Sequence, residues 1–219
     1  MQSLALLRLQ QCFDSQFPVG TFAHSGGIET YANLEGFGPD QLHDLLLTQI
    51  RYGWGRLDLA ASVMAWEQSF DEHALNALGG EVEAWKPIPG QRLAGLRVGR
   101  RTQALARRLY PKEMDGLDVR PPQVAVVAGA VARRLELERG PFTLFYAGSN
   151  LTAALAAATR SMSLSPERAQ EISVALQPVV VQQVDMVLDD PEASLFAATP
   201  AHDLRAHQQA FLHTRLFQS

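Results

Sequence analysis

Residues 13–29 read FDSQFPVGTFAHSGGIE, and the rest of the chain is interpreted outward from this stretch. It mixes bulky apolar side chains with hydroxyls, one imidazole and two carboxylates, so neither the helical nor the strand period accounts for it. Pro18 fixes its own φ and Gly20 permits φ values closed to other residues, which predicts a turn between two helices. We expect Phe17 and Phe22 to pack against this turn.

The second half of the stretch predicts a helix start. We expect Thr21 or Ser25 to cap a helix that begins near His24. Glu29 would then lie in the first turns, where the helix dipole favours a carboxylate. The simplest interpretation of these residues alone is a well-packed helix–turn–helix corner.

The composition is that of a folded protein with a sizeable core. The chain has 219 residues, of which 47% are hydrophobic and 19% charged, and its formal net charge is −4. These values exclude a disordered chain and one that coats nucleic acid. We expect one domain over residues 1–219.

Sequence features favour a reducing, cytoplasmic location. Cys12 is the only cysteine, so no internal disulfide forms. The N-terminal apolar run is interrupted by Arg8, Gln10 and Gln11 and does not resemble a signal peptide. The longest apolar-rich stretch, residues 147–158, is shorter than the roughly 20 residues of a membrane span.

Apolar periodicity along the chain predicts an all-α, single-domain bundle of about seven to ten helices. Gly53 and Gly55 are expected to break one helix, and Gly140-Pro141 to end another. The helical segments are expected near residues 4–9, 39–52, 57–65, 91–109, 122–135, 142–162 and 166–187, with a short helix in the tail.

The segment 91–109 predicts an amphipathic, strongly basic helix. Its apolar stripe would contain Val98, Thr102, Leu105 and Leu109, opposite Arg97, Arg100, Arg101, Arg107 and Arg108. Such a face suits phosphate, nucleic acid or an acidic protein surface, and the overall acidity argues against nucleic acid. A merely solvated face fits the pattern equally well.

No catalytic, metal or cofactor site emerges from the residue pattern. His24 and Ser25 invite a nucleophile–base reading, but neighbours on a helix diverge by about 100°. The six histidines form no H-x-x-x-H pair, and no phosphate-binding glycine motif occurs. A weak metal site shared between chains, using a tail histidine or Cys12, remains open.

The chain ends on apolar residues. Leu216 and Phe217 follow Arg215, and each apolar side chain forgoes about 1.5–3 kcal/mol if it stays in water. We therefore expect the C-terminal tail, residues 189–219, to dock on something.

The stretch F-P-x-G-x-F-x-H-S-G-G-I-E resembles the signature of the UreF family of urease accessory proteins. The ending Arg215-Leu216-Phe217-x-Ser219 is similar to the family's R-L-F-x-S ending. Two departures lie at residues 163–166, which replace a P-L-G-Q-type turn, and at Gln209-Ala210 with His213, where the family usually has a His-Glu pair and a Tyr.

The resemblance implies an all-helical, dimeric chaperone without catalytic residues or a cofactor of its own. Such a protein bridges a UreD (UreH)-type protein and the GTPase UreG, modulates that GTPase, and serves GTP-dependent nickel insertion into apo-urease; it meets neither nucleic acid nor membrane. Nickel would be handled by the assembled complex and GTP by the partner. The implied partner-binding residues are Phe17, Pro18, Gly20, His24, Ser25, Gly26, Gly27, Glu29, Arg215, Leu216 and Phe217. A generic helical scaffold unrelated to nickel, or a small hydrolase centred on His24 and Ser25, remain as alternatives.

Overall fold

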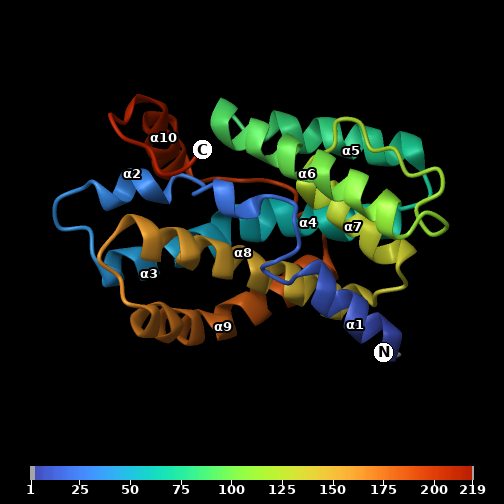
Figure 1. Ribbon diagram of the computed structural model, residues 1–219, viewed down its shortest axis with the longest axis horizontal. Coiled ribbons are helices and arrows are strands. Elements are labelled where there is room, and N and C mark those ends of the chain that lie inside the picture. The colour runs from blue at the N-terminus through green and yellow to red at the C-terminus, as the bar shows by residue number, and fades with distance from the viewer. Residues whose placement is uncertain (1–2, 219) are drawn as a thin grey trace.

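The computed structural model describes residues 3–218, apart from the side chain of Phe22 (Figure 1). Every regular element in that range is helical, which confirms the all-α prediction. The α-helices are α1 Ser3–Cys12, α2 Ile28–Ala32, α3 Pro39–Tyr52, α4 Trp54–Glu67, α5 Glu72–Ala84, α6 Pro89–Leu109, α7 Val124–Arg134, α8 Arg139–Ser161, α9 Pro166–Asp189 and α10 Pro200–Gln208, with short 3-10 turns η1 Thr21–Ala23 and η2 Gln209–Phe211. Within residues 3–218, none of these helices is long and apolar enough to cross a bilayer.

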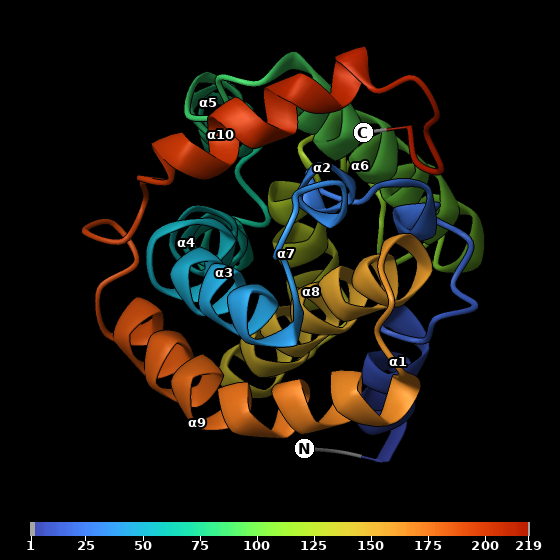
Figure 2. The same cartoon turned by 90° about the vertical axis from the view of Figure 1, so that its left-hand side faces the viewer.

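The helices surround α7 and α8, which run through the middle of the bundle (Figure 2). Helices α3 and α4 flank them on one side and α6 on the other, while α9 and α10 lie at opposite edges. The connection from α9 to α10 runs around the outside of the bundle. This path carries the C-terminal segment across the molecule to α2 and α6.

The closest helix approach is between α4 and α7. A Cβ atom built on Gly129 would overlap the carbonyl oxygen of Ser62 and lie 3.0 Å from the Cβ of Ala65. Ser62 and Ala65 are completely buried. The two backbones therefore meet with no side chain between them, which only glycine at position 129 permits.

Several helix ends follow the local sequence signals. Helix α3 begins at Pro39 and ends before Gly53, as predicted. Ser165 caps α9, since its Oγ accepts a hydrogen bond from the Arg168 N–H at 3.2 Å.

The predicted end of α7 at Gly140-Pro141 is wrong. Helix α7 ends at Arg134, and Glu136 adopts a positive φ of 61°. Helix α8 then begins at Arg139, with Pro141 as its third residue. Proline is tolerated there because the first-turn N–H groups have no partner within a helix.

The buried face of α6 also differs from the predicted stripe. It consists of Gly95, Val98, Gly99, Gln103 and Ala106, whereas Leu109 is 43% exposed. A Cβ on Gly99 would overlap the Pro122 carbonyl oxygen, so α6 packs on a neighbouring loop through its smallest residues. The arginines at positions 97, 100, 101, 107 and 108 are exposed, as predicted.

Candidate functional site

The predicted helix start near His24 is wrong. After η1 the chain stays irregular until α2 begins at Ile28, with Gly27 as its N-cap residue and no side-chain cap. Ser25 does not cap the helix: its Oγ accepts a hydrogen bond from the Gly27 N–H at 3.3 Å and so closes a turn. Gly20, Gly26 and Gly27 all have positive φ, so glycine shapes this backbone as predicted.

The start of α2 packs directly against α10 (Figure 1). A Cβ on Gly27 would lie 2.9 Å from the Cβ of Ala206 and 3.2 Å from Cε1 of His202. Any side chain at position 27 would therefore push α10 away. It would also be strained, because the backbone φ there is 94°. Gly27 of the N-terminal stretch therefore lets α10 pack directly on the backbone at the start of α2.

A buried hydrogen-bond cluster fixes this contact. The Gln209 side-chain Nε2 donates to Ser25 Oγ at 3.0 Å and to Glu29 Oε2 at 2.9 Å. The other Glu29 oxygen accepts the Leu216 N–H. Glu29 and Gln209 are each 3% exposed. One carboxylate thus joins residues 25–29 to both η2 and the tail.

The tail docks on its own chain through Phe217. This side chain is 5% exposed, and the Arg160 guanidinium carbon lies 4.5 Å from its ring centroid. The Gln218 N–H donates to the Ala23 carbonyl at 2.9 Å. Leu216 is 70% exposed and Arg215 is also exposed. The chain itself therefore buries Phe217, while the two preceding residues stay accessible. Ser219 lies outside the described residues.

Arginines of α6 border the N-terminal stretch, and Arg97 also donates a hydrogen bond to Gln218 Oε1 of the tail at 3.4 Å. The pKa of His24 is lowered by partial burial and by the charges of Arg97 and Arg101. A Cβ on Gly20 would overlap the Arg101 guanidinium, so this side chain lies against the bare Gly20 backbone. Phe17 is half-buried and Pro18 exposed. Of the predicted residues, Ser25, Gly27 and Glu29 therefore contact the C-terminal segment, and Gly20 and His24 lie next to the basic helix.

Two residues of this assembly were absent from the sequence prediction. In the sequence, Gln209 is only a departure from the family pattern, and His202 is only one of six histidines. No local signal marks either side chain, because each gains its role from packing against residues some 180 positions earlier. We name the assembly of residues 17–29, 202–209 and 215–218 the tail-docking site.

His202 is a buried neutral imidazole inside the tail-docking site. It is 7% exposed and stacks on Tyr31, with ring centroids 5.8 Å apart and an interplanar angle of 11°. Burial lowers its pKa from 6.5 to about 4, against a smaller opposite effect of a hydrogen bond with the Gly26 backbone. Burial raises the pKa of the stacked Tyr31. On the same helix as His202, the charge of Arg205 lowers the pKa of Tyr31 and that of Asp203 raises it.

Acidification is expected to destabilise the fold, because His202 is buried in its neutral form. As pH falls from 6.5 to about 4, the unfolded chain binds a proton that folded His202 does not, so stability is lost across this window. The loss is about 3 kcal/mol, since one pKa unit corresponds to about 1.4 kcal/mol. Urea unfolding across this pH range measures it. His202→Phe, which keeps the stacking, should flatten the dependence, and His207→Phe on the exposed face should not; equal slopes in all three proteins would contradict the prediction.

Cys12 and Ser25 are residues for which the sequence leaves a metal-binding or catalytic role open. Within residues 3–218, no group of three or more His, Cys, Asp or Glu side chains is arranged to hold a metal ion. Burial raises the pKa of Cys12 to about 11, which disfavours the thiolate needed for a metal ligand. Ser25 is 5% exposed and its hydroxyl accepts hydrogen bonds from amide donors, as a structural hydroxyl does.

Comparisons with known proteins show which family the chain belongs to. The UreF family model matches residues 37–177. The chain is 33% identical over 183 residues to the urease accessory protein UreF of Mycolicibacterium vanbaalenii, covering 82% of this chain and 83% of that protein. It is 29% identical to UreF of Mycobacterium sp. (strain JLS), covering 94% and 95%, and 25% identical over the full length of both chains to UreF of Hahella chejuensis. The chain therefore belongs to the UreF family of urease accessory proteins.

Proposed function

We propose that this chain is a non-catalytic adaptor of urease maturation. It bridges a UreD (UreH)-type protein and a UreG-type GTPase, modulates that GTPase, and so serves GTP-dependent nickel insertion into apo-urease in the cytoplasm. It acts as one domain with residues 189–219 as its docking tail, and it holds neither nickel nor a cofactor of its own. The observation that carries the proposal is the Glu29 carboxylate, which holds the N-terminal stretch and the tail in one surface.

The two sides of the tail-docking site suit two different partners. On one side, Leu216 and Arg215 present an exposed apolar group beside a guanidinium, a combination typical of interface anchors. On the other, Arg97 and Arg101 present positive charge next to His24, and Arg97 also contacts Gln218. We assign the tail side to the UreD-type protein and the basic side to an acidic surface of the GTPase.

Substitutions in the tail separate partner contact from tail docking. Leu216→Ala should weaken UreD-type binding at least tenfold, about 1.4 kcal/mol, and leave the fold unchanged because this side chain is largely in water. Phe217→Ala should also weaken binding, but by releasing the tail, because Phe217 is buried within this chain. Titration calorimetry measures the affinity for the UreD-type protein. The rate of trypsin cleavage after Arg215 measures release of the tail. Normal binding by Leu216→Ala would contradict the assignment.

The face formed by α8 and α9 suits a second copy of the chain. Leu144 and Phe145 on α8 and Val181 on α9 are each at least 40% exposed and line one hollow. Exposed apolar groups clustered in this way are typical of association surfaces. We propose that the homodimer forms here.

Phe145→Glu should convert the dimer to a monomer. Pairing two copies would bury a carboxylate in each without a partner, which costs several kcal/mol. Light scattering during size-exclusion chromatography gives the mass directly. Phe70→Glu is the matched control, since Phe70 is a more exposed aromatic side chain at the α4–α5 connection. If both variants remain dimeric, the interface lies elsewhere.

The adaptor role as a whole is tested by mixing the chain with the UreD-type and UreG-type proteins of the same source. We expect one species containing all three, detected by size-exclusion chromatography with light scattering. A chain that binds neither partner would favour the generic scaffold instead. Esterase or amidase activity that disappears in Ser25→Ala would favour the hydrolase.

A further inference from the structure

A cavity of about 900 Å³ lies between α4, α6 and α8, behind the N-terminal stretch. Protein interiors are close-packed, and voids much larger than a water molecule are rare in them. The volume is that of a small-molecule pocket, for which about 300–1,000 Å³ is typical. The size of the space therefore suggests an occupant larger than a few water molecules.

Apolar side chains supply much of the wall. Phe13 contributes from the end of α1, Trp54 and Leu57 from α4, Val98 from α6 and Val180 from α9. The lining also includes Leu144 and Phe145 of α8 and Val181 of α9, which are exposed on the α8–α9 surface. A ligand with an apolar body would find matching surroundings here.

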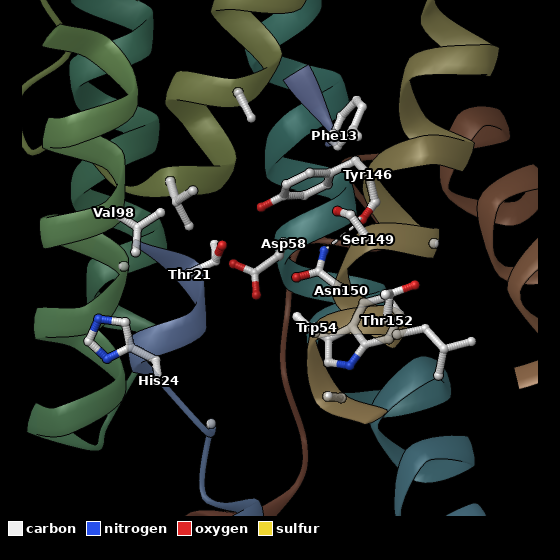
Figure 3. A pocket seen from close by; sticks show the side chains of 18 of the residues that line it. Phe13, Thr21, His24, Trp54, Asp58, Val98, Tyr146, Ser149, Asn150 and Thr152 are labelled. Atoms are coloured by element: carbon white, nitrogen blue, oxygen red, sulfur yellow. Dashed lines mark hydrogen bonds between the residues drawn. The ribbon is translucent and has the colours of Figure 1, made fainter. Parts of the chain in front are cut away.

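Several polar side chains also line the cavity. Lys86 Nζ and Asp58 Oδ1 are 2.7 Å apart, and both side chains are about 15% exposed or less. Figure 3 shows the Tyr146 hydroxyl, the Asp58 carboxylate and the Asn150 side chain pointing into the same space between α6 and α8. Gln49, which also lines the cavity, is 8% exposed and its Nε2 has no hydrogen-bond partner among the described residues.

These groups offer both hydrogen-bond donors and acceptors. Burial and the charge of Asp58 raise the pKa of Tyr146 well above its ordinary value, so its hydroxyl keeps its proton and can donate. Asp58 accepts, and the free Gln49 N–H donates. The Asp58–Lys86 pair is neutral as a whole, so a charged ligand would bring an uncompensated charge into a poorly solvated place.

We propose that this cavity binds an uncharged, mostly apolar small molecule whose head group both donates and accepts hydrogen bonds, as an amide or an alcohol does. The apolar body lies between Trp54 and Val98, and the head group meets Asp58, Tyr146 and Gln49. Binding involves no covalent step, and it does not depend on the adaptor role.

Two fluorescent probes with the same aromatic skeleton test the charge preference. N-phenyl-1-naphthylamine is uncharged, and its 8-sulfonate is an anion. Wild-type protein is expected to bind the uncharged probe saturably, one per chain, and at least tenfold more tightly than the sulfonate. Asp58→Asn leaves Lys86 without its carboxylate and should shift the preference towards the sulfonate by at least tenfold. Absence of saturable binding, or tighter binding of the sulfonate by the wild type, would overturn the proposal.

Two substitutions on α6 test the location. Ala94 lines the cavity and is half-buried, whereas Ala104 is exposed and lies outside the lining. Ala94→Phe should reduce probe affinity at least tenfold, and Ala104→Phe should leave it unchanged. Equal binding by both variants would place the probe on the outer surface and refute the cavity site. Circular dichroism checks folding and light scattering records the oligomeric state, so failure of the proposed dimer is detected separately.

Discussion

Gly129→Ala is expected to lower the free energy of unfolding by about 3 kcal/mol, although alanine is the better helix former. The added methyl group would overlap the Ser62 carbonyl oxygen, which belongs to the α4 backbone and cannot rotate away. Relief therefore requires α4 and α7 to separate, which loosens the middle of the bundle. Thermal unfolding should show a decrease of roughly 6–12 °C for a chain of this size.

Gly80→Ala is the matched control. Gly80 also lies inside a helix, but a Cβ there would meet nothing within 4 Å. The propensity gain should then appear alone, as a stabilisation of up to about 1 kcal/mol. The two variants carry the same chemical change with opposite expected signs. A stabilised Gly129→Ala would mean that the α4–α7 contact is looser than described.

Glu29→Ala is expected to release the tail and remove the binding that depends on it. The substitution leaves the Leu216 N–H without its buried acceptor, at about 1–3 kcal/mol for an unsatisfied group, and removes one of the two acceptors of the Gln209 amide. Trypsin cleavage after Arg215 should accelerate by at least tenfold. Affinity for the UreD-type protein should decrease in the same variant, because the surface that includes Leu216 is no longer held in place.

Glu35→Ala is the control for this experiment, since Glu35 is an exposed carboxylate shortly after α2. It should leave both the cleavage rate and the partner affinity unchanged. Rapid cleavage combined with normal affinity in Glu29→Ala would show that the partner itself orders the tail. Unchanged cleavage would show that Phe217 alone holds it.

The all-α class follows from local sequence, because helical periodicity and caps such as Ser165 act within a few residues. The predicted buried face of α6 failed because it depends on distant contacts. Helix α6 buries Gly95 and Gly99 rather than Leu109, because its neighbour is a loop backbone that approaches too closely for large side chains. The predicted stripe of Val98, Thr102, Leu105 and Leu109 carries no information about that approach.

The site was predictable in part for the same reason. The glycines stand out in sequence because glycine does not favour a regular helix, and the positive φ values agree. Glu29 was predicted in the first turns of the next helix, and it lies in the first turn of α2. Their partners do not stand out: Gln209 resembles any polar helix residue until it lies beside Ser25. Phe217 was expected to be a partner anchor from its position at an apolar chain end, whereas its burial in this chain makes it an internal anchor of the tail.

The hydrogen bond between Glu29 and Leu216 joins positions separated by 187 residues. During synthesis the N-terminal stretch leaves the ribosome long before its C-terminal counterpart exists, and contacts of such long range close late in folding. A nascent or C-terminally truncated chain therefore lacks the completed tail-docking site, even where α3 to α8 have already packed. In the cell, this topology restricts the completed surface to full-length chains.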